Sequence, residues 1–186
     1  MELLDILDEN ENYTGNVEER KVVHEKGYWH LHVGVWIMNK KGEFLFQKRS
    51  HLKEINPNKW TRTGGHVEAS EQPVFAIQRE TMEEIGVKIP IEKFELMNID
   101  KNETFFEDKQ IYNRQFIYHY FVLVDYEIED YTIQKEEVSD LKYITLEEMK
   151  KAKYNNDTSF TFVNWNNFDE IMVMLEKQRK KYVNKI

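Results

Sequence analysis

Residues 65–87 are the stretch that constrains the chain most, with the sequence GHVEASEQPVFAIQRETMEEIGV. A glycine opens this stretch, a proline lies near its middle, and a second glycine stands just before its end. Proline is well tolerated at the first position of a helix, and glycine favours the left-handed turn that ends one. The stretch therefore predicts a loop, a helix from Pro73 to Ile85 and a turn at Gly86.

The predicted helix has two different faces. One face should pack inward, because its less polar residues recur at intervals of three and four: Val74, Ile77, Thr81 and Ile85. On the other, Glu80, Glu83 and Glu84 fall within an arc of roughly 100°. Three carboxylates this close repel one another unless a cation lies among them. Because oxygen ligands suit Mg²⁺ or Mn²⁺, the sequence predicts a divalent metal site on this face.

The spacing of these residues resembles the signature box of the Nudix hydrolases. The matching positions are Gly65, Glu71, Arg79-Glu80, Glu83-Glu84 and Gly86 followed by the aliphatic Val87. The resemblance implies an α/β fold, the Nudix-type α/β/α sandwich with a mixed β-sheet between helices. It also implies that an ion pair between Arg79 and Glu71 supports the site. Thr81 departs from the bulky aliphatic residue that is usual in the box, and we expect this to affect packing.

The function predicted from the box is metal-dependent hydrolysis of a diphosphate linkage by water attack at phosphorus. The predicted metal ligands are the carbonyl of Gly65 and the carboxylates of Glu80, Glu83 and Glu84. The predicted catalytic group consists of Glu83, Glu80, Arg79 and Glu71. The general base stays open between a glutamate of the box and a downstream carboxylate, Glu136 or Glu137.

Other residues are candidates for holding the substrate. Lys48 and Arg49 end a predicted strand and could bind a phosphate, although a solvated loop is an equal alternative. Arg114 lies on a strand with alternating aromatic residues and could contact a base, a sugar or a phosphate. Glu137 completes this set, with a solvated acidic turn as its alternative.

Length and composition limit the remaining possibilities. With 186 residues, of which 13% are aromatic, we expect a single domain over residues 1–186. A net charge of −8 argues against a general nucleic-acid surface. We find no signal peptide and no apolar stretch that could span a membrane, so a cytoplasmic protein is expected. The expected partner is a small-molecule diphosphate, and the sequence leaves a homodimer open.

Alternating patterns predict the rest of the fold. The predicted strands are 28–38, 43–47, 60–63, 89–100, 111–124 and 141–144, preceded by a short strand at 2–8. A capping-box pattern at Thr145 predicts a helix start, and a further helix is predicted at about 164–182.

Four histidines, His24, His30, His32 and His66, invite a metal interpretation, against which we favour hydrogen-bonded structural histidines. The chain also resembles, more loosely, the isopentenyl diphosphate isomerase branch of the Nudix superfamily, whose histidine ligands would fall on the first, second and fourth of them. The catalytic cysteine of that branch would fall on Gly64, and the chain contains no cysteine. Its two strand glutamates would fall near Asn113 and Gln115. Isomerase activity is therefore a minor alternative, as is a Nudix module that senses or binds a nucleotide without cleaving it.

Overall fold

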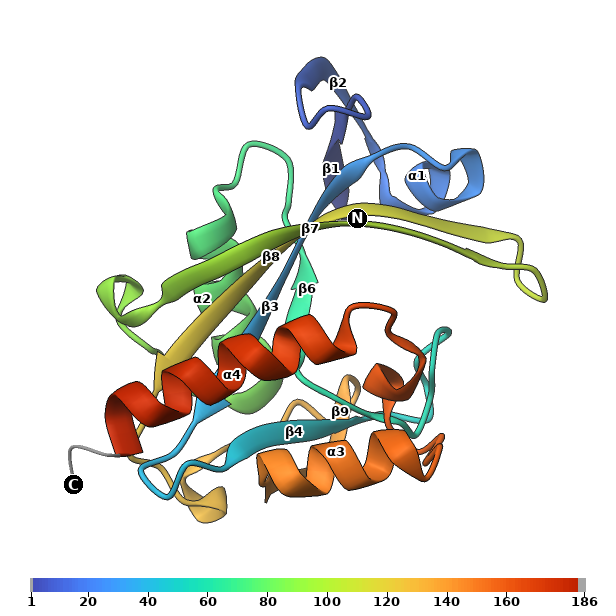
Figure 1. The fold of residues 1–186 in the computed structure, drawn as a ribbon. Coiled ribbons are helices and arrows are strands. Elements are labelled where there is room, and N and C mark those ends of the chain that lie inside the picture. The colour runs from blue at the N-terminus through green and yellow to red at the C-terminus, as the bar shows by residue number, and fades with distance from the viewer. Residues whose placement is uncertain (1, 184–186) are drawn as a thin grey trace.

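A computed structural model describes residues 2–183, and Figure 1 shows the course of the chain. The strands are β1 (Leu3–Leu7), β2 (Tyr13–Glu19), β3 (His30–Met38), β4 (Phe44–Arg49), β5 (Trp60–Thr61), β6 (Thr63–His66), β7 (Glu95–Phe106), β8 (Ile111–Leu123) and β9 (Val138–Ile144). The α-helices are α1 (Arg20–Lys26), α2 (Pro73–Ile85), α3 (Leu146–Tyr154) and α4 (Phe168–Val183). Short 3₁₀ helices are η1 (Ile91–Lys93), η2 (Ile128–Asp130) and η3 (Thr161–Asn164).

Strand β3 lies at the centre of the main sheet. It pairs with β8 in parallel over its whole length, from His30 opposite Gln115 to Met38 opposite Leu123. β7 continues the sheet antiparallel to β8. On the other side, β4 carries β5 and β9, both antiparallel to it. The sheet is therefore mixed, as predicted.

The main sheet forks beside β3. β3 pairs with β4 at one position only, Met38 opposite Phe44, whereas β6 pairs with β3 from His32 to Val35. The stretch predicted as one strand at 60–63 is divided, because β5 pairs with β4 and β6 pairs with β3. Since β4 and β3 separate towards the start of β3, the sheet opens there into a cleft.

Two apolar cores flank the sheet. On one face, α2 contributes Ile77 and Ile85 to a core with Val33 and Val35 of β3. On the other face, α3 and α4 cover Trp36. The even and odd residues of β3 thus face different helices, as a strand buried on both sides requires. The predicted α/β/α sandwich is confirmed (Figure 1).

Helix α2 follows the sequence prediction closely. Pro73 is its first residue, and Gly86 ends it in the left-handed conformation with a φ of 74°. Helix α3 follows Thr145, whose hydroxyl accepts a hydrogen bond from the amide of Glu148 while the Glu148 carboxylate accepts from the Thr145 amide. Both helix boundaries therefore have local side-chain or backbone causes.

Two other predictions were wrong in their boundaries. The strand predicted at 89–100 is β7, which begins at Glu95 because Pro90 and η1 precede it, and which continues to Phe106 alongside β8. The helix predicted at about 164–182 begins at Phe168, because η3 occupies the preceding turn.

The chain before β3 also differs from expectation. β2 pairs with β1 although all of its residues are exposed, and α1, which was not predicted, follows directly. Helix α1 has only seven residues and no side-chain cap at its start, so its sequence signal was weak. Its one clear signal is Gly27, which ends it with a φ of 68°. In the described part of the chain, no helix combines the length and apolar character needed to cross a bilayer.

Candidate active site

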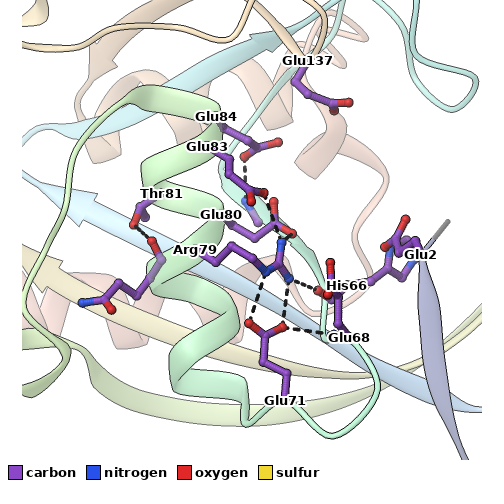
Figure 2. Close-up of polar contacts among 12 residues, drawn as sticks. Glu2, His66, Glu68, Glu71, Arg79, Glu80, Thr81, Glu83, Glu84 and Glu137 are labelled. Carbon is purple, nitrogen blue, oxygen red and sulfur yellow. Dashed lines mark hydrogen bonds and ion pairs between the residues drawn. The ribbon is translucent and has the colours of Figure 1, made fainter.

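Three carboxylates of α2 meet the end of β6 at the fork of the sheet. Glu84 is the most deeply placed, with only 5% of its surface exposed. Its Oε2 accepts hydrogen bonds from Nε2 of Gln47 at 2.9 Å and from the amide of Gly64 at 3.3 Å. Glu80 is largely buried beside it, whereas the Glu83 side chain is about half exposed. The exposure of the trio thus increases from Glu84 to Glu83, and Figure 2 shows the three side chains on α2.

Arg79 ties this trio to the preceding loop. Its guanidinium donates two hydrogen bonds to Glu71, from Nε to Oε1 at 3.1 Å and from Nη2 to Oε2 at 3.0 Å. Nη1 lies 2.9 Å from Oε1 of Glu80 and 3.2 Å from Oε2 of Glu83, and Nη2 also donates to the carbonyl of His66. Figure 2 shows Arg79 between Glu71 and the two α2 carboxylates. One side chain therefore fixes the loop, the helix and the carboxylates relative to one another.

Gly65 lies against Glu80 so closely that a side chain could not fit. A Cβ atom at this position would lie 2.1 Å from Oε1 of Glu80. The absence of a side chain lets the backbone of β6 and the Glu80 carboxylate share one small space. All of the predicted metal ligands, Gly65, Glu80, Glu83 and Glu84, line the same cleft, although their carboxylates do not form a group with ligand atoms all within 4.8 Å among the described residues.

The electrostatics of this group suit a divalent cation. Burial raises the pKa of Glu84, and the neighbouring Glu80 raises it further. Burial also raises the pKa of Glu80, against the lowering effect of Arg79. Two buried carboxylates that repel each other are stabilised by a cation between them. The cradle beside Gly65 and the all-oxygen donors fit Mg²⁺ or Mn²⁺.

The carboxylates line a large cleft of about 1030 Å³. Arg49 and Glu137 also line it, as does Lys53, whose ammonium pairs with the Glu137 carboxylate. The Nε of Arg49 donates to the carbonyl of Ile55 at 2.9 Å. Glu137 faces the α2 carboxylates across this space in Figure 2. Arg49 thus lies in the cleft as a cation that could bind a substrate phosphate, whereas the Glu137 carboxylate could act on one only through a cation.

Two of the predicted substrate residues lie elsewhere. Lys48 does not line the cleft, and its Nζ lies 5.9 Å from the centre of the Trp60 ring. Arg114 is also outside the lining, and its Nη2 lies 2.6 Å from Oε1 of Glu103. Alternation along a strand sends neighbouring side chains to opposite faces, which explains why Arg49 enters the cleft and Lys48 does not.

A second group of potential ligands adjoins the carboxylates. His24 of α1, His30 of β3 and His66 of β6 are buried, and their ligand nitrogens lie within 4.8 Å of one another. Nε2 of His24 is 3.2 Å from Nε2 of His66, whose Nδ1 lies 3.1 Å from Oε1 of Glu2. Burial lowers the pKa of His24 and His30 to about 4, so both are neutral near pH 7. This cluster could also hold a metal ion, and His32 is not part of it.

Sequence reasoning missed two residues of the cleft, Glu2 and Arg62, and a buried residue beside it, Gln47. Glu2 is remote in sequence from its partner His66, and Gln47 looks like an ordinary strand residue until its contact with Glu84 is seen. Arg62 lines the cleft from the junction of β5 and β6. For Gln47, a polar side chain among the apolar residues of β4 was the available signal.

The NUDIX domain model matches residues 28–165 of this chain. The chain belongs to the NUDIX domain family. An uncharacterised Nudix hydrolase of Clostridium acetobutylicum is 36% identical over 154 residues, which cover 81% of this chain and 73% of that protein. Nudix hydrolase 3 of Arabidopsis thaliana is 33% identical over 163 residues, or 86% of this chain, but the match spans only 21% of that protein.

Known structures and more distant relatives agree with this membership. The Deinococcus radiodurans protein DR0079 superposes with a TM-score of 0.62 at 21% identity, covering 83% of this chain and 90% of that one. The NUDIX domain of Shewanella oneidensis NrtR, solved with ADP ribose, gives a TM-score of 0.58 at 17% identity, covering 80% and 86%. Isopentenyl-diphosphate Delta-isomerase 2 of Photorhabdus laumondii is 27% identical over 83% of each chain. The two structures support the fold, and the looser likeness to the isomerase branch is confirmed.

Proposed function

We propose that this Nudix protein is a metal-dependent hydrolase that cleaves a diphosphate linkage in a small molecule, such as a nucleoside diphosphate joined to another group. The observation that carries the proposal is the placement of Glu80 against Gly65, with Arg79 bridging Glu80 and Glu83 and with Glu84 accepting from the Gly64 amide in the same cleft. The cytoplasm is the proposed compartment.

Each residue of this group has a distinct task in the proposed reaction. Glu80, Glu83 and Glu84, with the carbonyl of Gly65, would hold one or more Mg²⁺ or Mn²⁺ ions. When bound, a divalent ion neutralises charge on the phosphoryl oxygens and lowers the pKa of a water molecule, which is then more easily deprotonated for attack at phosphorus. Glu71 and Arg79 keep Glu80 and Glu83 oriented before substrate arrives, which lowers the entropic cost of reaching the reactive geometry.

The proton of the attacking water needs an acceptor near solvent. Glu83 is the carboxylate of the trio that is best exposed, whereas Glu84 is committed to Gln47 and Gly64. Glu83 is therefore our first candidate for the base. Glu137, across the cleft, is the second, but its carboxylate is already paired with the Lys53 ammonium.

Isomerisation of a prenyl diphosphate is less well supported. The histidine cluster and the isomerase relatives favour it, but the chain has no cysteine. A Cβ atom at Gly64, where the thiol would stand, would lie 2.2 Å from the carbonyl oxygen of Val33. The backbone therefore has no room for a cysteine side chain there. Asn113 and Gln115 cannot supply the acid that a carbon protonation needs.

The test is release of phosphate or mononucleotide from a panel of diphosphate compounds, including isopentenyl diphosphate, with Mg²⁺ or Mn²⁺. We expect one class to be cleaved, chelation to stop the reaction, and Glu83→Gln to reduce kcat by about 100-fold or more. Glu92→Gln, an exposed change on η1, is the matched control and should keep full activity.

Other outcomes would redirect the proposal. Turnover that survives Glu83→Gln would remove Glu83 from the mechanism. Saturable binding of an intact compound without product release would favour a binding module over a hydrolase. Conversion of isopentenyl diphosphate without phosphate release would favour the isomerase.

A further inference from the structure

Arg62 is a buried cation that lines the cleft, and its Nε has no hydrogen-bond partner. Only 8% of its surface is exposed. The Nε atom is itself buried, and Asp100 acts on the guanidinium through its charge and not through a hydrogen bond. A guanidinium carries five donors, and burying it without acceptors is costly. The position therefore calls for an explanation beyond folding.

The surroundings hold this guanidinium in a defined place. Its Cζ lies 5.3 Å from the ring centre of Trp36 and 4.9 Å from that of Trp165. Gly34 lies directly beneath, where a Cβ atom would be 2.2 Å from Nε of Arg62. Two indole rings and a missing side chain thus build a seat for a planar cation. Arg62 lies between β5 and β6, and both of these strands are paired in the sheet. The position of the Arg62 backbone is therefore fixed.

Arg62 keeps its charge in this seat. Burial lowers the pKa of Arg62 to about 10, which still leaves it protonated near pH 7. The negative charge of Asp100 raises the pKa of Arg62, but the Asp100 carboxylate already has other partners. Its Oδ2 lies 2.8 Å from Nε2 of His119, and its Oδ1 accepts from Nδ2 of Asn98 at 2.6 Å. The nearby acid is thus occupied, and the Arg62 donors remain free for another molecule.

The lining near Arg62 includes another buried polar atom without a partner. Nδ1 of His32, two residues before Gly34 on β3, is buried, lacks a hydrogen bond and belongs to a residue that lines the cleft. Trp165 contributes to the lining as well. An apolar prenyl chain would leave all of these groups unpaired, which disfavours it as the occupant.

We propose that Arg62 determines substrate specificity by binding an anionic oxygen group, a carboxylate or a phosphate, on the part of the substrate beyond the hydrolysed diphosphate. This inference rests on the proposed function, because it concerns the part of the same cleft that would hold the rest of the substrate. A planar fork of donors matches either anion with two parallel hydrogen bonds. An anionic group fits this position better than a neutral oxygen, because its negative charge compensates the buried positive charge of Arg62, which no carboxylate in direct contact neutralises.

Two substrate pairs that differ by one anionic group test the proposal. UDP-glucuronate against UDP-glucose compares a carboxylate with a hydroxymethyl group, and NADPH against NADH adds a phosphate. For at least one pair we expect kcat/KM to favour the anionic member by about 10-fold or more, as a charge-assisted hydrogen bond supplies. Arg62→Gln should reduce that preference to less than about 2-fold. Arg179→Gln, which removes a guanidinium outside the cleft lining, should leave it unchanged.

A measurement that needs no turnover separates this inference from the proposed function. Tryptophan fluorescence of the metal-free protein is titrated with inorganic phosphate and, separately, with acetate, since two indoles flank Arg62. We expect a saturable change that Arg62→Gln weakens by about 10-fold and Arg62→Lys by less, with unchanged melting temperatures as the folding control. No saturable change in the natural protein, or equal titrations with and without Arg62, would overturn the inference. Such a result would stand whether or not any diphosphate is cleaved.

Discussion

At the scale of single residues, the site depends on two glycines that leave space for a neighbouring side chain. Gly65 gives its space to the Glu80 carboxylate, and Gly34 gives its space to the Arg62 guanidinium. Gly34 and Gly65 are not among the glycines with a positive φ. Each position therefore requires glycine because a neighbouring side chain comes close, and not because the backbone needs a left-handed conformation. A methyl group is enough to disturb either arrangement.

Gly65→Ala should therefore impair catalysis more than folding. The new methyl group would displace Glu80 by about 1 Å, and misplacement of that size can cost about 100-fold in rate. Steady-state kcat with Mg²⁺, with the melting temperature measured alongside, checks this. Gly15→Ala, where nothing lies within 4 Å but φ is 80°, is the control: backbone strain should lower its melting temperature while kcat stays full. A fully active Gly65→Ala protein would contradict the assigned geometry.

Glu84 should show opposite effects on stability and function. Its carboxylate is buried beside that of Glu80, so without metal its charge is unfavourable. We expect Glu84→Gln to raise the free energy of unfolding of the metal-free protein by about 1 kcal/mol or more, and to abolish stabilisation by Mg²⁺. Urea denaturation with and without Mg²⁺ measures both effects. A variant that is less stable without metal and still gains stability from Mg²⁺ would show that Glu84 is not a ligand.

At the scale of elements, prediction succeeded where the cause of structure is local. The start and end of α2 follow from Pro73 and Gly86, and the start of α3 follows from Thr145. The division of residues 60–66 into β5 and β6 depends on two different partner strands, and no local pattern records that. The same reason explains the site: the box spacing placed the carboxylates together, whereas Arg62 required knowledge of the fork.

Thr145→Ala tests how far the local signal stabilises its helix. The change removes the hydroxyl that accepts from the Glu148 amide at 3.1 Å. Loss of such a cap should lower the free energy of unfolding by about 1 kcal/mol. Chemical denaturation measures the effect, with Thr145→Ser as the variant that retains the cap and should stay near the natural stability. Activity per folded molecule should not change, because α3 lies outside the cleft lining.

At the scale of the whole molecule, the buried histidines make stability sensitive to acid. Burial lowers the pKa of His24, His30 and His119 to about 4. Burial also lowers the pKa of His32 and His66. Below the ordinary histidine pKa of 6.5, the unfolded chain therefore binds more protons than the folded one. The free energy of unfolding should be highest near neutral pH and should fall as the pH drops from about 6.5 towards 4.

His119→Gln should make this dependence shallower. Glutamine has a similar length and does not titrate, so it removes one of the groups whose protonation opposes folding while leaving an amide near Asp100. A shift from 6.5 to about 4 corresponds to about 3 kcal/mol between the two ends of the window. Urea unfolding of the metal-free protein at several pH values gives the slope. An identical slope in the variant would mean that His119 is protonated in the folded state at these pH values.

The fork of the sheet separates the two walls of the cleft along the chain. The box residues that face the scissile linkage all precede residue 88, whereas the opposite wall comes from later segments around Asp100, Asn102, Trp165 and Asn167. A genetic crossover between these regions would exchange one wall and leave the other whole. Descendants of such an event would keep the box carboxylates together with Arg62, and would inherit different later residues around that guanidinium, which makes this side of the fold a natural place for specificity to be adjusted.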